Sequence, residues 1–497
     1  MKVPVSRRAF LGAGLSTAAF ATLALAGCAP ATTSVAANGT IRYQFFTGSA
    51  LKDVGSVETA INALLKKRGK KFTVKLEPLD STTYRQRMPL DLAAGTAADV
   101  FFTAPWLNDY YKNVSDGNLL ALDSLLSKSA PTLKSTMSES WWNAVRVNGK
   151  VYGVINQQLF PKTWGFVAKG DLAEKYGLDA SKITRYDQLG PFLADVKKGE
   201  PDVTPLYSEV SGSTFFRSEI YGWDGSLETY GLAVKADDKN LKVFNMFETD
   251  EFKETCELMR KWARAGYTAT TAPSGTDANS AWANGKIALQ FNQVNRGTPW
   301  PFDVVQKTLV DPLTLSTASV NATMTGINAA SKNPQAAIEW IELLNTDKEL
   351  YNLICFGIEG KHWEFIDKSK GVVGFPAGVT ASTSPYNPNE DWAFGNQFNA
   401  YYRTREAADA QLWKQQEGQN SSAAISTLMG FNLDTTSLKT QIATVTAAIG
   451  QYKPQSVLGQ VDPATGVPNM VNQLKAAGID AIQKEAQKQI DAWKKNS

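Results

Sequence analysis

The chain has 497 residues, of which 43% are hydrophobic and 20% are charged, with 51 Lys and Arg residues against 48 Asp and Glu residues. This length is enough for about three domains, and the composition excludes an intrinsically disordered chain and a collagen-like one. The sequence holds a single histidine, His362, which excludes a multi-histidine metal site and leaves one residue through which any catalytic triad would have to work. We expect neither a metal ion nor a cofactor.

The N-terminal segment has the pattern of an export signal. Arg7 and Arg8 give it a charged start, a small and apolar stretch follows, and the tetrapeptide LAGC ends it at Cys28. SRRAFLG resembles a twin-arginine export motif, and LAGC resembles a bacterial lipobox, whose cysteine becomes the lipidated first residue. We predict a signal peptide over 1–27, lipid on Cys28, a tether over 28–40, and a location at the outer face of the bacterial cytoplasmic membrane. The alternative is an ordinary cleaved secretory peptide with a chance cysteine.

The charge balance changes when this signal is removed. Cleavage before Cys28 takes away Lys2, Arg7 and Arg8 and no acid, which leaves 48 basic and 48 acidic residues. A nucleic-acid partner requires a basic face, whereas these basic residues are scattered among acids, so we exclude that partner. The remaining cysteines, Cys256 and Cys355, could form at most one disulfide, and we favour two buried thiols.

The first part of the mature chain alternates strands and helices. Apolar runs predict strands over 41–47, 71–79 and 98–103, with helices over 52–68 and 83–94, the second kinked by Pro89. This βαβαβ order indicates a doubly wound parallel sheet, in which ligands bind beyond the carboxyl ends of the strands. That edge would carry the last residues of the first strand, Phe46 and Thr47, and residues that follow the third strand, Trp106, Asn108 and Asp109.

The same alternation restarts after residue 158, with a strand near 163–169, a helix from Asp171 to Gly177 and a helix from about Thr184. A helix over 250–265 is the strongest prediction, because Thr249 can cap it, acids begin it, bases end it and Gly266 stops it. Its apolar face holds Phe252, Cys256, Met259 and Ala263. A strand over 285–291 and a helix entered through Asn333-Pro334 follow. We assign Trp262, Trp282 and Trp340 to the core.

The order of several motifs resembles a known family. After SRRAFLG and LAGC come ADVFFTAPWLNDYYKNVSDGNLLALDSLL, GKVYGVINQQ, NGKIALQF and GINAASKNPQAAIEWIELL. This series is similar to the extracellular solute-binding proteins (family 1) of ABC importers, in the group that binds maltose and oligosaccharides. The last third contains GIEGKHWEF, FGNQFNAYY, GFNLDTTSLKTQIATV and QLKAAGIDAIQKEAQKQIDAW, which resemble the C-terminal extension of large lipoproteins of the LipO type.

The resemblance implies an α/β fold of the periplasmic-binding-protein type II, with two lobes joined by crossing segments and a cleft that closes on ligand. We expect the first lobe over 41–153 plus 292–327 and the second over 154–291 plus 328–380. A mainly helical C-terminal extension would cover 381–497. The crossings would lie near 151–158, 287–295 and 324–330.

A cleft for sugars needs aromatic plates and planar amide or carboxylate partners, and the chain has 13 Trp, 16 Tyr and 23 Phe residues. Besides the five residues at the first-lobe edge, we predict ligand contacts from the first crossing, from a glycine-bounded loop, and from the segment after GKIALQF. These are Asn156, Gln157, Gln158, Tyr221, Trp223, Asp224, Asn292, Gln293, Asn295 and Arg296. His362 and Trp363 belong either to a ligand loop or to a structural turn, and we include Trp363 among the contacts.

The resemblance implies a monomeric receptor that captures a sugar or oligosaccharide and delivers it to permease subunits, without catalysis. Two other functions stay open. One is a binding protein for a peptide or another polar solute. The other is a secreted glycosidase, which would need only two carboxylates flanking a sugar bond, and for which Asp109 and Asp224 are the candidates.

Overall fold

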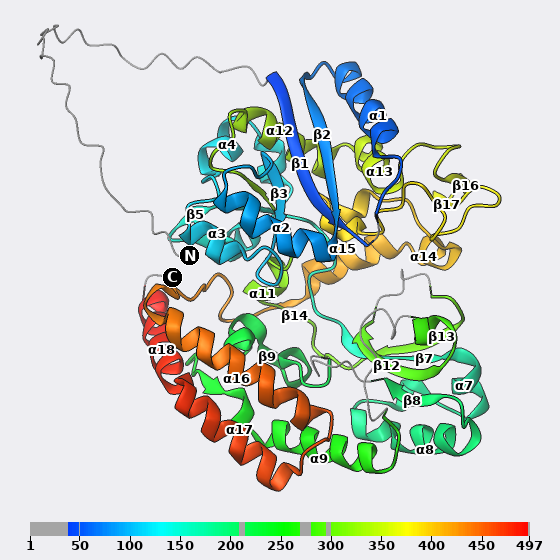
Figure 1. The fold of residues 1–497 in the computed structure, drawn as a ribbon, viewed down its shortest axis with the longest axis vertical. Helices are drawn as coiled ribbons and strands as arrows, with labels where there is room; N and C mark the ends of the chain where they lie inside the picture. The colour runs from blue at the N-terminus through cyan, green and yellow to red at the C-terminus, as the bar shows by residue number, and fades with distance from the viewer. Residues whose placement is uncertain (1–37, 49, 208–213, 269–279, 295–299, 496–497) are drawn as a thin grey trace, which may run out of the picture. The chain divides into compact units, whose positions relative to one another are not determined.

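The computed structural model describes residues 38–497, apart from 49, 208–213, 269–279, 295–299 and 496–497. Signal peptide, Cys28 and most of the predicted tether lie outside the described residues. The chain forms two lobes, each with its own sheet and hydrophobic core, and a C-terminal extension that packs on both (Figure 1). The two-lobed α/β prediction is confirmed.

The first lobe is built on a five-stranded sheet with the order β2-β1-β3-β15-β6. β1 is parallel to β2 and β3, as the βαβαβ pattern predicts, while β15 is antiparallel to both β3 and β6. β1, β3 and β6 therefore end at the same edge of the sheet. The strands are β1 (Asn38–Thr47), β2 (Lys71–Asp80), β3 (Val100–Thr103), β6 (Gly153–Ile155) and β15 (Met324–Ile327).

Amphipathic helices cover this sheet. α1 buries Val57, Ile61 and Leu65 against it. Pro89 lies inside α2, which continues to Ala93 without a break, and the predicted kink at Pro89 stays a prediction. The helices are α1 (Val54–Lys67), α2 (Ser81–Ala93), α3 (Tyr110–Ser115), α4 (Asp123–Lys128), α5 (Pro131–Ser135), α6 (Glu139–Ala144), α12 (Pro334–Thr346) and α13 (Lys348–Phe356). Two hairpins complete the lobe: β4 (Arg146–Val147) with β5 (Lys150–Val151), and β16 (Glu364–Asp367) with β17 (Val372–Gly374).

The second lobe holds a four-stranded sheet, β13-β7-β12-β8, and a smaller sheet of β11, β10 and β9. Its strands are β7 (Trp164–Lys169), β8 (Thr204–Tyr207), β9 (Trp223–Asp224), β10 (Leu232–Lys235), β11 (Phe244–Asn245), β12 (Ile287–Gln293) and β13 (Val304–Thr308). Its helices include α7 (Gly170–Lys175), α8 (Gly190–Gly199) and α9 (Asp250–Arg264). α9 confirms the strongest helix prediction: the hydroxyl of Thr249 caps it, and Trp262, not Ala263, completes its buried face.

The predicted lobe boundaries and crossings need correction. β12 and β13 both pair with β7, so 292–294 and 300–308 belong to the second lobe. The apolar faces of α12 and α13 pack in the first-lobe core, so 328–380 belongs to the first lobe. The predicted crossing at 287–295 falls within and just after β12, and the one at 324–330 begins with β15. The lobes are instead joined by 156–163 and by 309–323, which contains β14 (Thr314–Leu315) and α11 (Thr317–Val320). A third connection runs through β18 (Ala424–Ile425), which pairs with β14.

The C-terminal extension is mainly helical, as predicted, and is divided between the lobes. Its first part contributes Tyr386, Phe394 and Ala400 to the first-lobe core. Its last three helices pack on the second lobe beside α9 (Figure 1). The elements are η6 (Asp391–Ala393), η7 (Gln397–Asn399), α14 (Arg405–Asp409), α15 (Leu412–Ser422), η8 (Thr436–Leu438), α16 (Lys439–Val457), α17 (Pro463–Ala477) and α18 (Ile479–Lys494).

The core predictions hold. Trp262, Trp282 and Trp340 are all buried, and Cys256 and Cys355 are free, buried thiols. In the part of the chain that the structure describes, no helix combines the length and the apolar character that a membrane span requires.

Candidate functional site

Trp106 lies on a tight loop beyond the carboxyl end of β3. Asn108 adopts a positive φ of 52° and folds the loop back, with its side-chain amide donating to the carbonyl of Phe102 at 2.9 Å. Asp109 then caps α3 by accepting from the backbone N–H groups of Tyr111 and Lys112. Because the turn is fixed on both sides, it presents the Trp106 ring outward. Trp106 is 48% exposed, whereas Ala104 and Leu107 beside it are buried, and large apolar side chains are usually buried.

Trp106 belongs to a cluster of four rings, which we call the aromatic platform: Phe46, Phe102, Trp106 and Trp392. The Trp106 and Trp392 ring centroids are 6.0 Å apart, and Phe46 lies 6.2 Å from Trp106 and 5.5 Å from Trp392. Phe46 and Phe102 are buried beneath, whereas Trp392 is half-buried. The indole N–H of Trp106 donates to the carbonyl of Ala322 at 2.7 Å. The platform is thus a supported apolar surface at the edge where parallel strands end.

Trp392 comes from the C-terminal extension and is held there by the first lobe. Its neighbour Asp391 accepts two hydrogen bonds from Arg403, at 2.6 and 3.2 Å, and its backbone carbonyl accepts from the Tyr351 hydroxyl. The Asn156 amide donates to the carbonyl of Ala393 at 2.9 Å. The short 3₁₀ helix η6 is therefore anchored on both sides of the indole.

Glu390 precedes this segment and lies beside the platform. A Cβ at Gly48, just beyond the end of β1, would lie 3.6 Å from the Glu390 carboxyl. Burial, together with the negative charge of Asp391, raises the pKa of Glu390 to about 8, although the indole of Trp392 acts in the opposite direction. Sequence reasoning missed both Glu390 and Trp392, because the stretch 381–396 has no periodicity and no motif that points to them.

The second lobe carries an aromatic group at the corresponding edge of its sheet. Trp164, at the start of β7, pairs with Gln293, at the end of β12, next to the first crossing. The Arg217 guanidinium lies 4.4 Å from the centre of the Trp164 ring and forms a 3.2 Å ion pair with Glu228. Such stacking combines an apolar face with planar donors, which suits polar ligands that have flat apolar faces. Sequence reasoning did not select these residues either.

A cavity of about 350 Å³ lies at this edge, between the first crossing, β13 and α15. Its lining is rich in amides and hydroxyls: Leu159, Thr163, Val294, Gln306, Lys307, Thr308, Leu412, Gln415, Gln416 and Gln419. Because it adjoins the crossing between the lobes, it belongs to the same region as Trp164.

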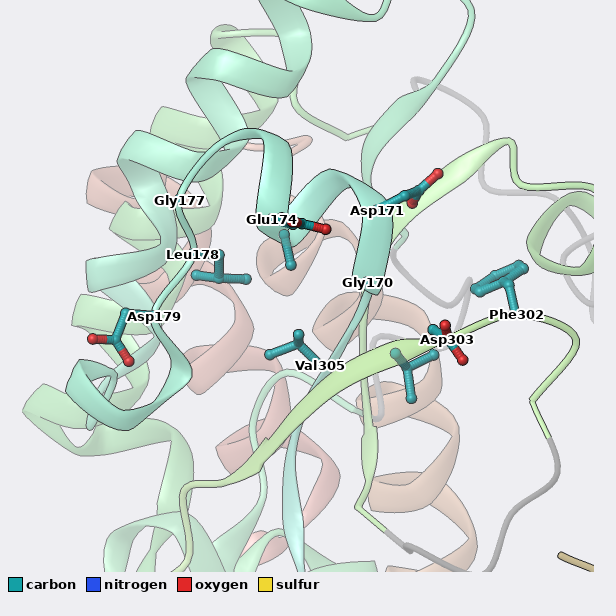
Figure 2. A pocket seen from close by; sticks show the side chains of 11 residues that line it. Gly170, Asp171, Glu174, Gly177, Leu178, Asp179, Phe302, Asp303 and Val305 are labelled. Atoms are coloured by element: carbon teal, nitrogen blue, oxygen red, sulfur yellow. The ribbon is translucent and has the colours of Figure 1, made fainter. Parts of the chain in front are cut away.

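Larger cavities lie elsewhere. Figure 2 shows one of about 820 Å³, lined by Asp171, Glu174, Asp179 and Asp303 with Phe302, at the end of the second-lobe sheet opposite Trp164. Another, of about 1000 Å³, lies between α3 with the β4–β5 hairpin and residues 429–436 of the extension. Neither cavity is lined by a residue of the aromatic platform.

The structure brings the predicted first-lobe residues together but gives them different roles. Trp106 faces outward, and Phe46 supports it from below. Thr47 is fully buried. Asn108 and Asp109 build the loop that positions Trp106, and their predicted ligand contacts remain predictions.

The predicted crossing residues are mostly structural. Gln157 is buried, and its amide donates to the Asn345 side chain at 3.1 Å, so it joins the crossing to α12. The Gln158 amide donates to Thr323 on the second crossing. Asn292 is half-buried at the end of β12. Asn295 and Arg296 lie outside the described residues.

The glycine-bounded loop departs from the prediction. Trp223 is only 4% exposed and packs against Phe244, while Asp224 is buried and caps η4 (Gly225–Tyr230). Tyr221 is half-buried, with its hydroxyl bonded to Thr255. These side chains fill the second-lobe core because the small sheet and the C-terminal helices cover them.

Of the two interpretations of His362 and Trp363, a ligand loop or a structural turn, the structure supports the structural turn. His362 is buried, accepts from the Ile358 N–H at Nδ1, and meets Asp53 through Nε2 at 3.0 Å. Trp363 is buried too, and its indole donates to the Gly357 carbonyl. We therefore exclude Trp223, Asp224 and Trp363 from the candidate site. Among the described residues, no group of three or more His, Cys, Asp or Glu side chains is arranged to hold a metal ion.

Comparisons with known proteins agree with this architecture. Residues 48–350 match the family described as bacterial extracellular solute-binding protein, and residues 427–495 match a domain of unknown function, DUF3502. A carbohydrate ABC transporter substrate-binding protein of Streptococcus pneumoniae serotype 4 is 26% identical over 424 residues, which cover 83% of each chain.

Among solved structures, the N-glycan transport solute binding protein NgtS of Streptococcus pneumoniae has the same fold. Its TM-score is 0.80 at 23% identity, covering 92% of this chain and 100% of that one. Its complex with Man1GlcNAc gives a TM-score of 0.76 at 23% identity, covering 92% and 99%.

Proposed function

The chain belongs to the bacterial extracellular solute-binding protein family, and from this membership we propose that it is the receptor of an ABC importer and captures an oligosaccharide. The ligand would bind between the aromatic platform of the first lobe and the Trp164 edge of the second. The receptor would then deliver it to permease subunits in the membrane.

The exposed indole of Trp106 is the observation that carries this proposal. Leaving apolar surface of an indole in water costs hydrophobic free energy, and this indole is supported from below by Phe46 and Phe102 at the edge of the sheet where ligands bind. Sugar rings offer flat C–H faces that stack on indoles. The carbohydrate-binding relatives, NgtS and the Streptococcus pneumoniae importer protein, support this class of ligand over a peptide.

We propose binding without a reaction. The two carboxylates considered for a glycosidase, Asp109 and Asp224, each cap a helix, and Asp224 is buried in the second-lobe core. A carboxylate pair flanking a sugar bond would need both groups free to reach the substrate.

The direct test is a thermal-shift screen of the chain from Ala29 onward, which contains every described residue. The probes are Man1GlcNAc, Man5GlcNAc, kestose and maltotriose, with a tripeptide panel beside them. A ligand at about a hundred times its dissociation constant should add roughly 2.7 kcal/mol to the free energy of unfolding. Stabilisation by peptides and by none of the saccharides would contradict the proposal.

We also propose export and lipid attachment at Cys28, supported by the lipobox-like LAGC in the sequence. Cys28→Ser removes the only thiol that the motif could acylate. The variant is expected to leave the membrane fraction and appear in the soluble fraction, as measured by cell fractionation and immunoblotting. Equal membrane association of variant and wild type would show that the anchor assignment is wrong.

The lobes should close on the ligand. Their sheets are separate and are joined through 156–163, 309–323 and β18, so a change of angle between them would leave both cores intact. Small-angle X-ray scattering is expected to show a smaller radius of gyration with a saturating saccharide than without it. An identical scattering profile in both conditions would argue against closure.

A further inference from the structure

The carboxyl group of Glu390 is placed where a ligand on the aromatic platform would meet it. It lies next to Gly48 at the carboxyl end of β1 and directly precedes Asp391 and Trp392 in the chain. The side chain is half-buried, so part of it faces outward. A ring stacked on the two indoles would therefore bring its hydroxyl groups toward this carboxyl.

No described cation compensates Glu390. Asp391 forms an ion pair with Arg403. Asp53, beyond the end of β1, interacts with Lys361 and His362. Asp80, at the end of β2, accepts from Thr83. Neighbouring segments carry the basic residues Lys52, whose backbone N–H donates to the Pro385 carbonyl, and Arg85, whose guanidinium donates to the Trp106 carbonyl at 3.3 Å. Besides burial, only Asp391 and Trp392 shift the pKa of Glu390.

We propose that Glu390 is the carboxyl that hydrogen-bonds the saccharide on the platform and that its ionised form disfavours acidic saccharides. The inference rests on the proposed oligosaccharide function. A protonated carboxyl donates one hydrogen bond and accepts others, which matches a sugar hydroxyl. A uronate or sialic acid would instead bring a carboxylate next to Glu390, and the two like charges oppose binding where Glu390 is ionised, above about pH 8.

The protonation state of Glu390 decides whether the saccharide affinity rises or falls with pH. Glu390 holds its proton at neutral pH and loses it as the pH rises through about 8. A ligand that covers the carboxyl and accepts a hydrogen bond from its O–H stabilises the protonated form further. The affinity is therefore constant below pH 7 and falls above pH 8, by roughly tenfold between pH 6.5 and pH 9.5.

The test is titration calorimetry at both pH values with the chain from Ala29 onward. The neutral probes are Man5GlcNAc, kestose and maltotriose, and the acidic probes are trigalacturonate and sialyllactose. The matched pair of variants is Glu390→Gln, which cannot ionise, and Glu364→Gln, which removes an exposed carboxyl on β16. We expect the loss of affinity at pH 9.5 in the wild type and in Glu364→Gln but not in Glu390→Gln. We also expect acidic probes to lose more affinity than neutral probes when the pH rises from 6.5 to 9.5, because only at the higher pH does the ionised Glu390 repel them.

The outcomes separate the two proposals. If neutral saccharides bind but the pH dependence is the same in Glu390→Gln, or if acidic saccharides lose no more affinity than neutral ones at pH 9.5, the inference on Glu390 is wrong and the oligosaccharide function stands. If no saccharide binds, the proposed function fails, and the inference fails with it. If Glu390→Gln does not fold, as judged by circular dichroism, the wild-type pH dependence and its difference between neutral and acidic probes decide the question.

Discussion

Trp106→Ala is expected to weaken saccharide binding by roughly ten- to a hundredfold, or very roughly 1 to 3 kcal/mol, while changing the melting temperature little. The indole is 48% exposed, so its removal leaves no large cavity, and Phe46 and Phe102 remain packed beneath. The substitution therefore removes the surface on which the saccharide stacks and leaves the core unchanged. Titration calorimetry measures the affinity, and thermal melting without ligand measures the stability.

Trp106→Phe is the matched variant. It keeps an aromatic ring but loses the indole N–H that donates to Ala322. We expect its affinity to lie between those of the wild type and Trp106→Ala. A Trp106→Ala protein that binds like the wild type but melts much earlier would mean that Trp106 is a core residue and that the site is misplaced.

Trp262→Ala is expected to have the opposite effect, a loss of roughly 3 to 5 kcal/mol in the free energy of unfolding with normal binding by the folded fraction. Trp262 is 1% exposed on α9, and its ring lies 6.5 Å from that of Phe291 in the second-lobe core. Removing a buried side chain of this size opens a cavity that the surrounding residues fill only in part.

Denaturant unfolding at equilibrium measures this loss, and calorimetry with the same saccharide gives the affinity. If Trp262→Ala melts like the wild type, the second-lobe core is packed differently from the structure. If its stability holds while its affinity drops, Trp262 and not Trp106 would contact the ligand.

Local patterns in the sequence predicted those helices and strands whose formation depends mainly on residues close together in the chain. The strands and helices of the first βαβαβ unit appear within a few residues of their expected ends, and Thr249 caps α9 as predicted. The placement of Trp106 beyond β3 follows from the rule for parallel sheets. The same rule placed Phe46 at this edge, although as a buried support.

The errors all involve contacts between distant parts of the chain. β13 joins the second-lobe sheet through β7, more than a hundred residues away, and no local signal fixes that pairing. Trp223 looked like a loop residue because its own segment is short and glycine-bounded, yet the second-lobe core encloses it. Trp392 and Glu390 reach the first-lobe site from the C-terminal extension, almost three hundred residues after Trp106, and only the folded chain brings them there.

A crystal structure of the chain from Ala29 onward with the most tightly bound saccharide of the panel tests the central claim most directly. We predict a sugar ring stacked on Trp106 with carbon atoms about 4 Å from the indole. A hydroxyl of the same ring should lie within hydrogen-bond distance of Glu390. A saccharide bound in one of the other cavities, with Trp106 still open to solvent, would contradict the assignment of the site.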